Sequence, residues 1–326
     1  MVALSVLDLV PVSEGQPPAD ALRNAAGLAR HAESLGYQRY WVAEHHNMVG
    51  IASAATSVVI GFIAGGTSRI RVGAGGIMLP NHAPLIIAEQ FGTLEQLYPG
   101  RIDLGLGRAP GTDRQTLQAL RRDASAAESF PQDVLELQAL LGPLQPGQTV
   151  QAVPGTDTNV PLWILGSSLY GAQLAAMLGL PYGFASHFAP DALYQALHLY
   201  RERYQPSARN PAPYAMTGVN VIVAQTDGEA ERLFTSIQMR FADMLRGARG
   251  YLKPPIDDIE TYWTPAEKLQ ASRMLECSFA GSPEKVSVEL RAFVKSTGAD
   301  ELMVASAIHD HAARLKSYEL LAALDL

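Results

Sequence analysis

Short runs of hydrophobic residues alternate along the chain with longer segments whose hydrophobic residues recur every three or four positions. The short runs predict β-strands, and the longer segments predict amphipathic helices. The predicted strands are residues 4–10, 39–43, 70–79, 101–106, 162–165, 182–185, 219–224 and 302–305. The predicted helices are residues 19–35, 53–65, 84–97, 131–141, 170–178, 191–204, 227–245, 265–275, 283–297 and 309–323.

The alternation of strand and helix favours an α/β fold, a single (β/α)8 TIM-type barrel with insertions after strands 4 and 7. A doubly wound open sheet is the alternative, because alternation by itself does not close a barrel. No Gly-x-Gly-x-x-Gly motif follows the first strand, which weakens that alternative. No linker or internal repeat divides the chain, so we expect one domain over residues 1–326.

Composition narrows the class of protein. The chain is 48% hydrophobic and 17% charged, as expected for a globular protein. Its net charge of −7 and the absence of a Lys/Arg run argue against a nucleic-acid partner. The single cysteine, Cys277, excludes a disulfide framework within one chain. The N-terminus lacks a signal-peptide pattern, and no apolar run approaches the ~20 residues that span a bilayer. We therefore expect a cytoplasmic protein without a membrane partner.

Three titratable residues, Glu44, His45 and His46, follow directly after an apolar strand. In a (β/α)8 barrel, the carboxyl ends of the strands carry the active site. A carboxylate and two histidines suit acid–base chemistry or metal ligation. Neighbouring residues on an extended segment point in opposite directions, so both histidines cannot easily reach one ion. Other histidines that follow predicted strands would join only if the barrel places them together: His82, His187 and His309. No metal site is therefore predicted.

Two further segments suit an anionic ligand. Residues 166–171 (Gly-Ser-Ser-Leu-Tyr-Gly) lie between a predicted strand and a predicted helix, where backbone N–H groups favour a phosphate. An ordinary serine N-cap explains the same pattern. Arg108 follows the neighbouring strand and could share that phosphate. Glycines at 73, 75 and 76 mark either a ligand lying against the backbone or tight packing inside the barrel.

The whole set of motifs resembles the bacterial luciferase-like flavin monooxygenases, within the subgroup of uncharacterised oxidoreductases. The matching stretches are residues 41–46 (Trp-Val-Ala-Glu-His-His), 71–80, 100–108, 161–168 and 281–284. The resemblance runs from the first strand to the last helix and so covers nearly the whole chain, and its motifs are specific together rather than singly.

The resemblance implies a barrel that uses reduced FMN and O2, through a peroxyflavin, to oxidise a small organic substrate. It implies that His45 is the catalytic base and that Glu44 supports it, with His46 pointing the other way as a structural residue. It also implies that Arg108 holds the FMN phosphate. The remaining cofactor-binding residues that it implies are Ala74, Gly75, Gly76, Gly166, Ser167, Ser168, Leu169, Tyr170 and Gly171. The peptide bond between Gly75 and Gly76 is expected to be cis.

The resemblance also bears on the oligomeric state and the electron source, and it leaves two alternative functions open. The small residues of segment 53–65 resemble the family's dimer helix and imply a homodimer. Electrons for the flavin come either from NAD(P)H in place or from a separate flavin reductase. Gly107 stands where luciferase carries a reactive cysteine, which argues against light emission. A non-catalytic flavin-binding protein and a deazaflavin-dependent dehydrogenase of the same fold remain the alternatives.

Overall fold

The computed structural model describes residues 2–109 and 113–326, and the side chain of Ala124 is left out. Within that part of the chain, nine parallel strands form one sheet in the order β6-β5-β4-β3-β2-β1-β9-β7-β8. Pairing of β6 with β7 closes the sheet into a TIM-type barrel, as predicted. The strands are β1 (Ala3–Asp8), β2 (Arg39–Val42), β3 (Arg71–Met78), β4 (Ile102–Gly107), β5 (Leu162–Gly166), β6 (Tyr182–Phe184), β7 (Ala215–Val223), β8 (Ser278–Gly281) and β9 (Glu301–Ala305).

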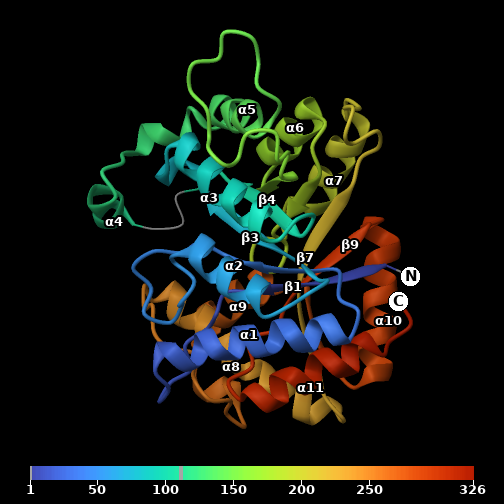
Figure 1. Ribbon diagram of the computed structural model, residues 1–326. Coiled ribbons are helices and arrows are strands. Elements are labelled where there is room, and N and C mark those ends of the chain that lie inside the picture. The colour runs from blue at the N-terminus through green and yellow to red at the C-terminus, as the bar shows by residue number, and fades with distance from the viewer. Residues whose placement is uncertain (1, 110–112) are drawn as a thin grey trace.

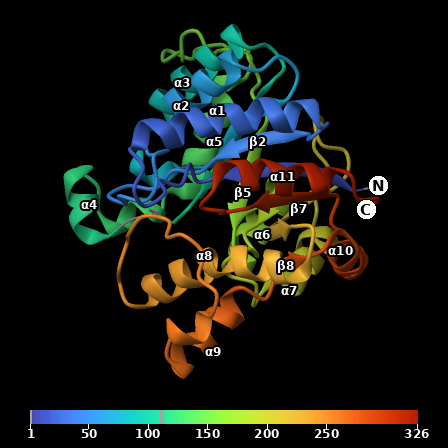
Figure 2. The ribbon, with the colours of Figure 1, turned by 90° about the horizontal axis from the view of Figure 1, so that it is seen from below.

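Helices surround the barrel, and α1 and α11 lie side by side on its outer surface (Figures 1 and 2). The α-helices are α1 (Pro18–Ser34), α2 (Thr56–Gly65), α3 (Pro84–Leu97), α4 (Arg114–Ala119), α5 (Phe130–Leu141), α6 (Leu169–Leu178), α7 (Leu193–Glu202), α8 (Asp227–Leu245), α9 (Pro265–Met274), α10 (Pro283–Thr297) and α11 (His311–Ala322). Short 3-10 helices are η1 (Leu79–Asn81), η2 (Ala124–Ala127) and η3 (Ile259–Thr261). None of the described helices is both long enough and apolar enough to cross a bilayer.

Two elements were missed by the sequence prediction. Strand β8 pairs with the second half of β7, beyond the end of the short β6. It has four residues and includes no long apolar run, so hydrophobic periodicity could not find it. Helix α4 lies in the insertion after β4 and buries no residue among those described, which explains why it has no apolar stripe.

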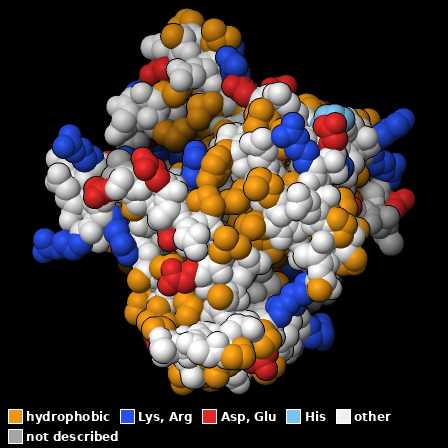
Figure 3. Space-filling view, turned by 90° about the horizontal axis from the view of Figure 1, so that it is seen from above, with side chains coloured by type: hydrophobic (Ala, Val, Ile, Leu, Met, Phe, Trp, Pro, Cys, Tyr) orange, Lys and Arg blue, Asp and Glu red, His pale blue; other side chains and the backbone are white. Residues whose placement is uncertain are grey.

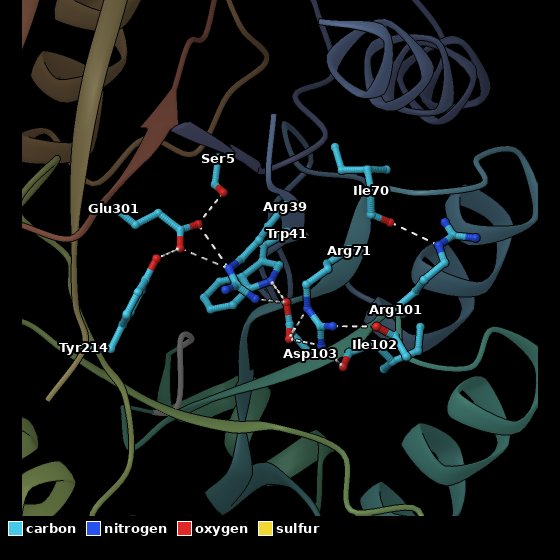
Figure 4. Close-up of polar contacts among 11 residues, drawn as sticks. Ser5, Arg39, Trp41, Ile70, Arg71, Arg101, Ile102, Asp103, Tyr214 and Glu301 are labelled. Carbon is cyan, nitrogen blue, oxygen red and sulfur yellow. Dashed lines mark hydrogen bonds and ion pairs between the residues drawn. The ribbon is translucent and has the colours of Figure 1, made fainter. Parts of the chain in front are cut away.

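Buried charges fill the N-terminal end of the barrel (Figure 4). Arg39 opens β2, and its guanidinium lies 2.8 Å from Asp103 and 3.1 Å from Glu301. Arg71 opens β3, and it lies 2.6 Å from the other oxygen of Asp103. Both carboxylates are fully buried. Because each charge has a partner of opposite sign, the network ties β2, β3, β4 and β9 together without leaving an isolated buried charge.

An apolar layer lies next to this charged layer. The indole rings of Trp41 and Trp163 meet edge to face, with ring centroids 5.2 Å apart. Their neighbours inside the barrel are Leu7, Ala43, Met216 and Met303. Since side chains alternate along a strand, the residues between these positions face outward and pack against the helices. The barrel is therefore a packed core whose free end is the carboxyl end of the strands.

The face seen from above carries no continuous basic region. Lys and Arg side chains are scattered there, mostly near its edge, and hydrophobic side chains occupy much of its centre (Figure 3).

Candidate active site

The strand alternation separates His45 from its two neighbours. Trp41 and Ala43 point into the barrel, so His45 lies on the interior side at the mouth. Glu44 and His46 lie on the opposite side, where Nε2 of His46 is 2.7 Å from Oε1 of Glu44. The prediction that His46 points away from His45 agrees with this arrangement.

Glu44 is bound to residues other than His45. Its carboxylate accepts hydrogen bonds from His46, from Nε2 of His82 at 2.9 Å, from the backbone N–H of Met78 at 2.9 Å and from the side-chain amide of Asn81 at 3.2 Å. Burial by itself would raise the pKa of Glu44, but these hydrogen bonds outweigh it and bring the pKa to about 2. This carboxylate therefore fixes the segment after β3, and its predicted support of His45 stays a prediction.

The same cluster is the one group in the described part of the chain with the composition and spacing of a metal site. Glu44, His46 and His82 offer ligand atoms that all lie within 4.8 Å of one another. Their chemistry suits a divalent transition metal. The hydrogen bonds just described already satisfy the carboxylate, however, so the geometry does not require an ion.

His45 has the properties of a neutral base. Burial, together with the nearby Arg240, lowers the pKa of His45 to about 4, against the opposing effect of Glu44. At neutral pH the imidazole is therefore uncharged. Its Nδ1 is buried and has no hydrogen-bond partner among the described residues. An unpartnered buried nitrogen at the mouth of a barrel is free to exchange a hydrogen bond or a proton with a ligand.

His187 follows β6 and lies close to His45. Burial lowers the pKa of His187 to about 4, and His45 adds to the shift. A Cβ atom at Gly218 of β7 would lie 2.3 Å from Nδ1 of His187, so the glycine makes room for this ring. The amide of Asn220, two residues further along β7, donates to the backbone carbonyl of His187 at 2.6 Å. The end of β7 thus positions a second neutral histidine.

The predicted phosphate residues come together. The guanidinium of Arg108 stacks on the ring of Tyr170, 4.0 Å from its centroid. Tyr170 lies in the first turn of α6, and the N-cap residue of that helix, Ser168, makes no side-chain capping bond. The N–H groups of the first turn are therefore open to an anion beside an exposed arginine. This arrangement fits a phosphate group, although Ser167 has no described contact that singles it out.

The glycine-rich part of β3 is tightly packed. The peptide bond between Gly75 and Gly76 is cis, as expected. A Cβ atom at Gly76 would lie 2.6 Å from the carbonyl oxygen of Gly105, and one at Gly75 would lie 2.9 Å from Leu7. Packing against β1 and β4 therefore accounts for both glycines. Ala74 is fully buried and its carbonyl faces Gly105, so its predicted contact with a cofactor stays a prediction.

Comparison with known proteins agrees with this geometry. Residues 2–301 match the family described as luciferase-like monooxygenase. The chain belongs to the luciferase-like monooxygenase family. A protein of that description from Escherichia coli K12 is 54% identical over 320 residues, which cover 98% of this chain and 96% of the relative. The N-acetyl-S-alkylcysteine monooxygenase of Bacillus subtilis is 30% identical and is covered to 97%. The crystal structure of apo-MsnO8 superposes with a TM-score of 0.91 at 38% identity, covering 99% of this chain and 98% of that one.

The sequence analysis missed one charged residue near His45. Arg240 lies in the C-terminal half of α8, in the insertion after β7, and no local motif marks it. The sequence predicts that His82, His187 and His309 join the other strand ends only if the barrel places them together. The structure brings His82 to Glu44 and His187 to His45, whereas Nε2 of His309 lies 3.3 Å from the backbone carbonyl of Glu14.

Proposed function

We propose that the protein is a flavin-dependent monooxygenase that uses reduced FMN and O2 to oxidise a small organic substrate. The observation that carries the proposal is the pairing of two features at one barrel mouth. One is the neutral His45 with its unpartnered Nδ1, and the other is the anion-binding arrangement of Arg108 and the N-terminus of α6. Reduced FMN, when bound, would supply the electrons for oxygen activation.

The residues of this chain then bind the flavin phosphate, orient the reacting groups and transfer protons. Arg108 and the first N–H groups of α6 hold the phosphate, and Tyr170 keeps the guanidinium in place by stacking. His45 exchanges a proton or hydrogen bond through Nδ1 with the reacting groups at the mouth. Glu44 holds the ends of β2 and β3 at a fixed distance through Met78 and His82.

FMN binding and oxygen consumption test the proposal. The purified protein is titrated with FMN by fluorescence quenching and then mixed with chemically reduced FMN, air and a trial thioether. A thioether is the first class to try because of the name of the B. subtilis relative, N-acetyl-S-alkylcysteine monooxygenase. We expect FMN binding in the micromolar range and one ¹⁸O atom from ¹⁸O₂ in the product. Failure of both FMN and reduced FMN to bind would refute the proposal, and binding without turnover of any trial class would favour a flavin-binding protein.

The electron source belongs to the same proposal. We propose that reduced FMN comes either from reduction in place by NAD(P)H or from a separate flavin reductase. Oxidation of NAD(P)H by the purified protein with FMN, followed at 340 nm, would select reduction in place. Turnover that requires an added reductase would select the second route.

A homodimer is the second part of the proposal. Helix α2 is rich in small and apolar residues, and it exposes Val58 (71%) and Phe62 (54%) to solvent. Ile86 at the start of α3 is 46% exposed. Exposed apolar side chains on adjacent helices are typical of a protein–protein interface. Analytical ultracentrifugation of the wild-type protein and of Phe62→Glu measures the oligomeric state. A wild-type dimer that becomes a monomer in the variant supports this face as the interface, and an unchanged dimer excludes it.

A further inference from the structure

Arg240 reaches the barrel mouth from an insertion. Helix α8 packs through Leu233 and Ile237 against Ile222 and Ile308, which lie at the carboxyl ends of β7 and β9. Arg240 is three residues after Ile237 and therefore shares its core-facing side of the helix. Arg240 is near enough to His45 that its charge helps to lower the pKa of the imidazole.

This guanidinium has no partner in the part of the chain that the structure describes. Among the described residues, Arg240 makes no hydrogen bond, ion pair or ring contact, although it is partly buried and burial lowers its pKa. One helical turn earlier, the hydroxyl of Ser236 is also buried without a hydrogen-bond partner in the described structure. Residues four apart on a helix are neighbours, so α8 presents an unpartnered hydroxyl next to a guanidinium without a counter-ion in the described structure.

By contrast, Arg39 and Arg314, whose side chains are only slightly exposed, are paired with carboxylates. Arg39 binds Asp103 and Glu301, and Arg314 binds Asp8 at 2.8 Å. A buried cation without a counter-ion is costly, and a ligand that brings a negative charge removes the cost. Glu44 cannot serve as counter-ion, because its oxygens are engaged with His46, His82 and Met78.

We propose that Arg240, with Ser236 beside it, binds the carboxylate of an acidic organic substrate at the barrel mouth next to His45. The assignment of this ligand as the substrate rests on the proposed function. A planar guanidinium can form two parallel hydrogen bonds with a carboxylate, which orients the ligand as well as attracting it. The phosphate of FMN has a separate proposed site, formed by Arg108 and the N-terminus of α6. Arg240 therefore selects substrates with a negative charge.

Benzoate and its neutral counterpart benzamide test the proposal without any turnover. Binding of each is measured by calorimetry at low ionic strength, to the protein alone and to the protein with oxidised FMN. The variants are Arg240→Gln and Arg240→Lys. The matched control is Arg232→Gln on the same helix, where an exposed arginine pairs with Asp257 at 2.7 Å. Circular dichroism and melting temperature check that each variant folds.

We expect Arg240→Gln to weaken benzoate binding by about tenfold or more, and Arg240→Lys to weaken it less, because lysine keeps the charge but not the fork. Benzamide should bind weakly to all variants, and Arg232→Gln should behave as wild type. Failure of benzoate to bind the wild type, equal binding of benzamide, or unchanged binding by Arg240→Gln would overturn the proposal. So would an equal loss of FMN affinity in Arg240→Gln, which would assign the arginine to the cofactor. If the protein binds benzoate but not FMN, the carboxylate site is supported and only the proposed function is refuted.

Discussion

Nε2 of His46 and Oε1 of Glu44 lie 2.7 Å apart, and His45, which separates them in the sequence, takes no part in that bond. The three residues after β2 therefore have two separate roles, one structural and one chemical. Glu44 and His46 fasten β2 to the segment after β3, while His45 is left with an unpartnered nitrogen at the mouth. Each role predicts a different result on mutation.

Replacing Glu44 should lower stability in a pH-dependent way. The pKa of Glu44 falls from 4.5 to about 2 on folding, so its ionised form stabilises the fold above pH 4.5, and this contribution disappears as pH falls towards 2. We expect Glu44→Gln to reduce the free energy of unfolding by about 2 kcal/mol at pH 7. The difference from wild type should shrink between pH 5 and pH 2.5. Urea unfolding across this range measures it, with Glu136→Gln on the exposed surface of α5 as control. A difference that does not change with pH would contradict the pKa assignment.

Replacing His45 should separate binding from turnover. His45→Ala removes the neutral imidazole but leaves Arg108 and α6, so FMN affinity should change little while turnover falls by about 10²–10⁴-fold. In the wild type, turnover should fall as pH drops through the His45 pKa of about 4, because the protonated ring no longer accepts a proton. Steady-state rates against pH test both statements. The exposed His198→Ala on α7 is the control, and turnover of His45→Ala equal to wild type would remove His45 from the mechanism.

The stacked pair of Arg108 and Tyr170 predicts a phosphate-dependent loss of affinity. Arg108→Ala should weaken FMN by about 10–100-fold and riboflavin, which lacks the phosphate, much less. Fluorescence titration of both flavins measures the ratio. The exposed Arg203→Ala should leave both affinities unchanged. An equal loss for FMN and riboflavin would mean that Arg108 does not hold the phosphate.

A single methyl group at Gly218 should disturb the second histidine. A Cβ there would lie 2.3 Å from Nδ1 of His187, so Gly218→Ala must displace the ring, at a cost of about 1–3 kcal/mol in stability. Gly228→Ala at the start of α8 meets no atom within 4 Å and should be neutral or slightly stabilising. Thermal unfolding compares the two variants, and equal melting temperatures would show that His187 is not held against β7.

The fold was predictable because most of its strands and helices have their own periodicity. The position of His45 on the interior side followed from the alternation of residues after Trp41. The hydrogen bonds of Glu44 could not be predicted in the same way, because two of its partners, Met78 and His82, are more than thirty residues away in the sequence. Arg240 was unpredictable for a similar reason, since nothing in the sequence of a helix tells which of its charged residues will lack a partner.

The charged network at the opposite end of the barrel limits where ligands can enter and leave. Arg39, Asp103 and Glu301 close one end of the barrel, and the edge-to-face rings of Trp41 and Trp163 lie next to them. We therefore expect ligands to enter at the other end, where an ion pair between Asp113 and Arg249 joins the insertions after β4 and β7. Substrate entry and product release would then use the same end of the barrel. Changes in these two insertions can then alter how fast the protein works without altering any residue that performs the chemistry.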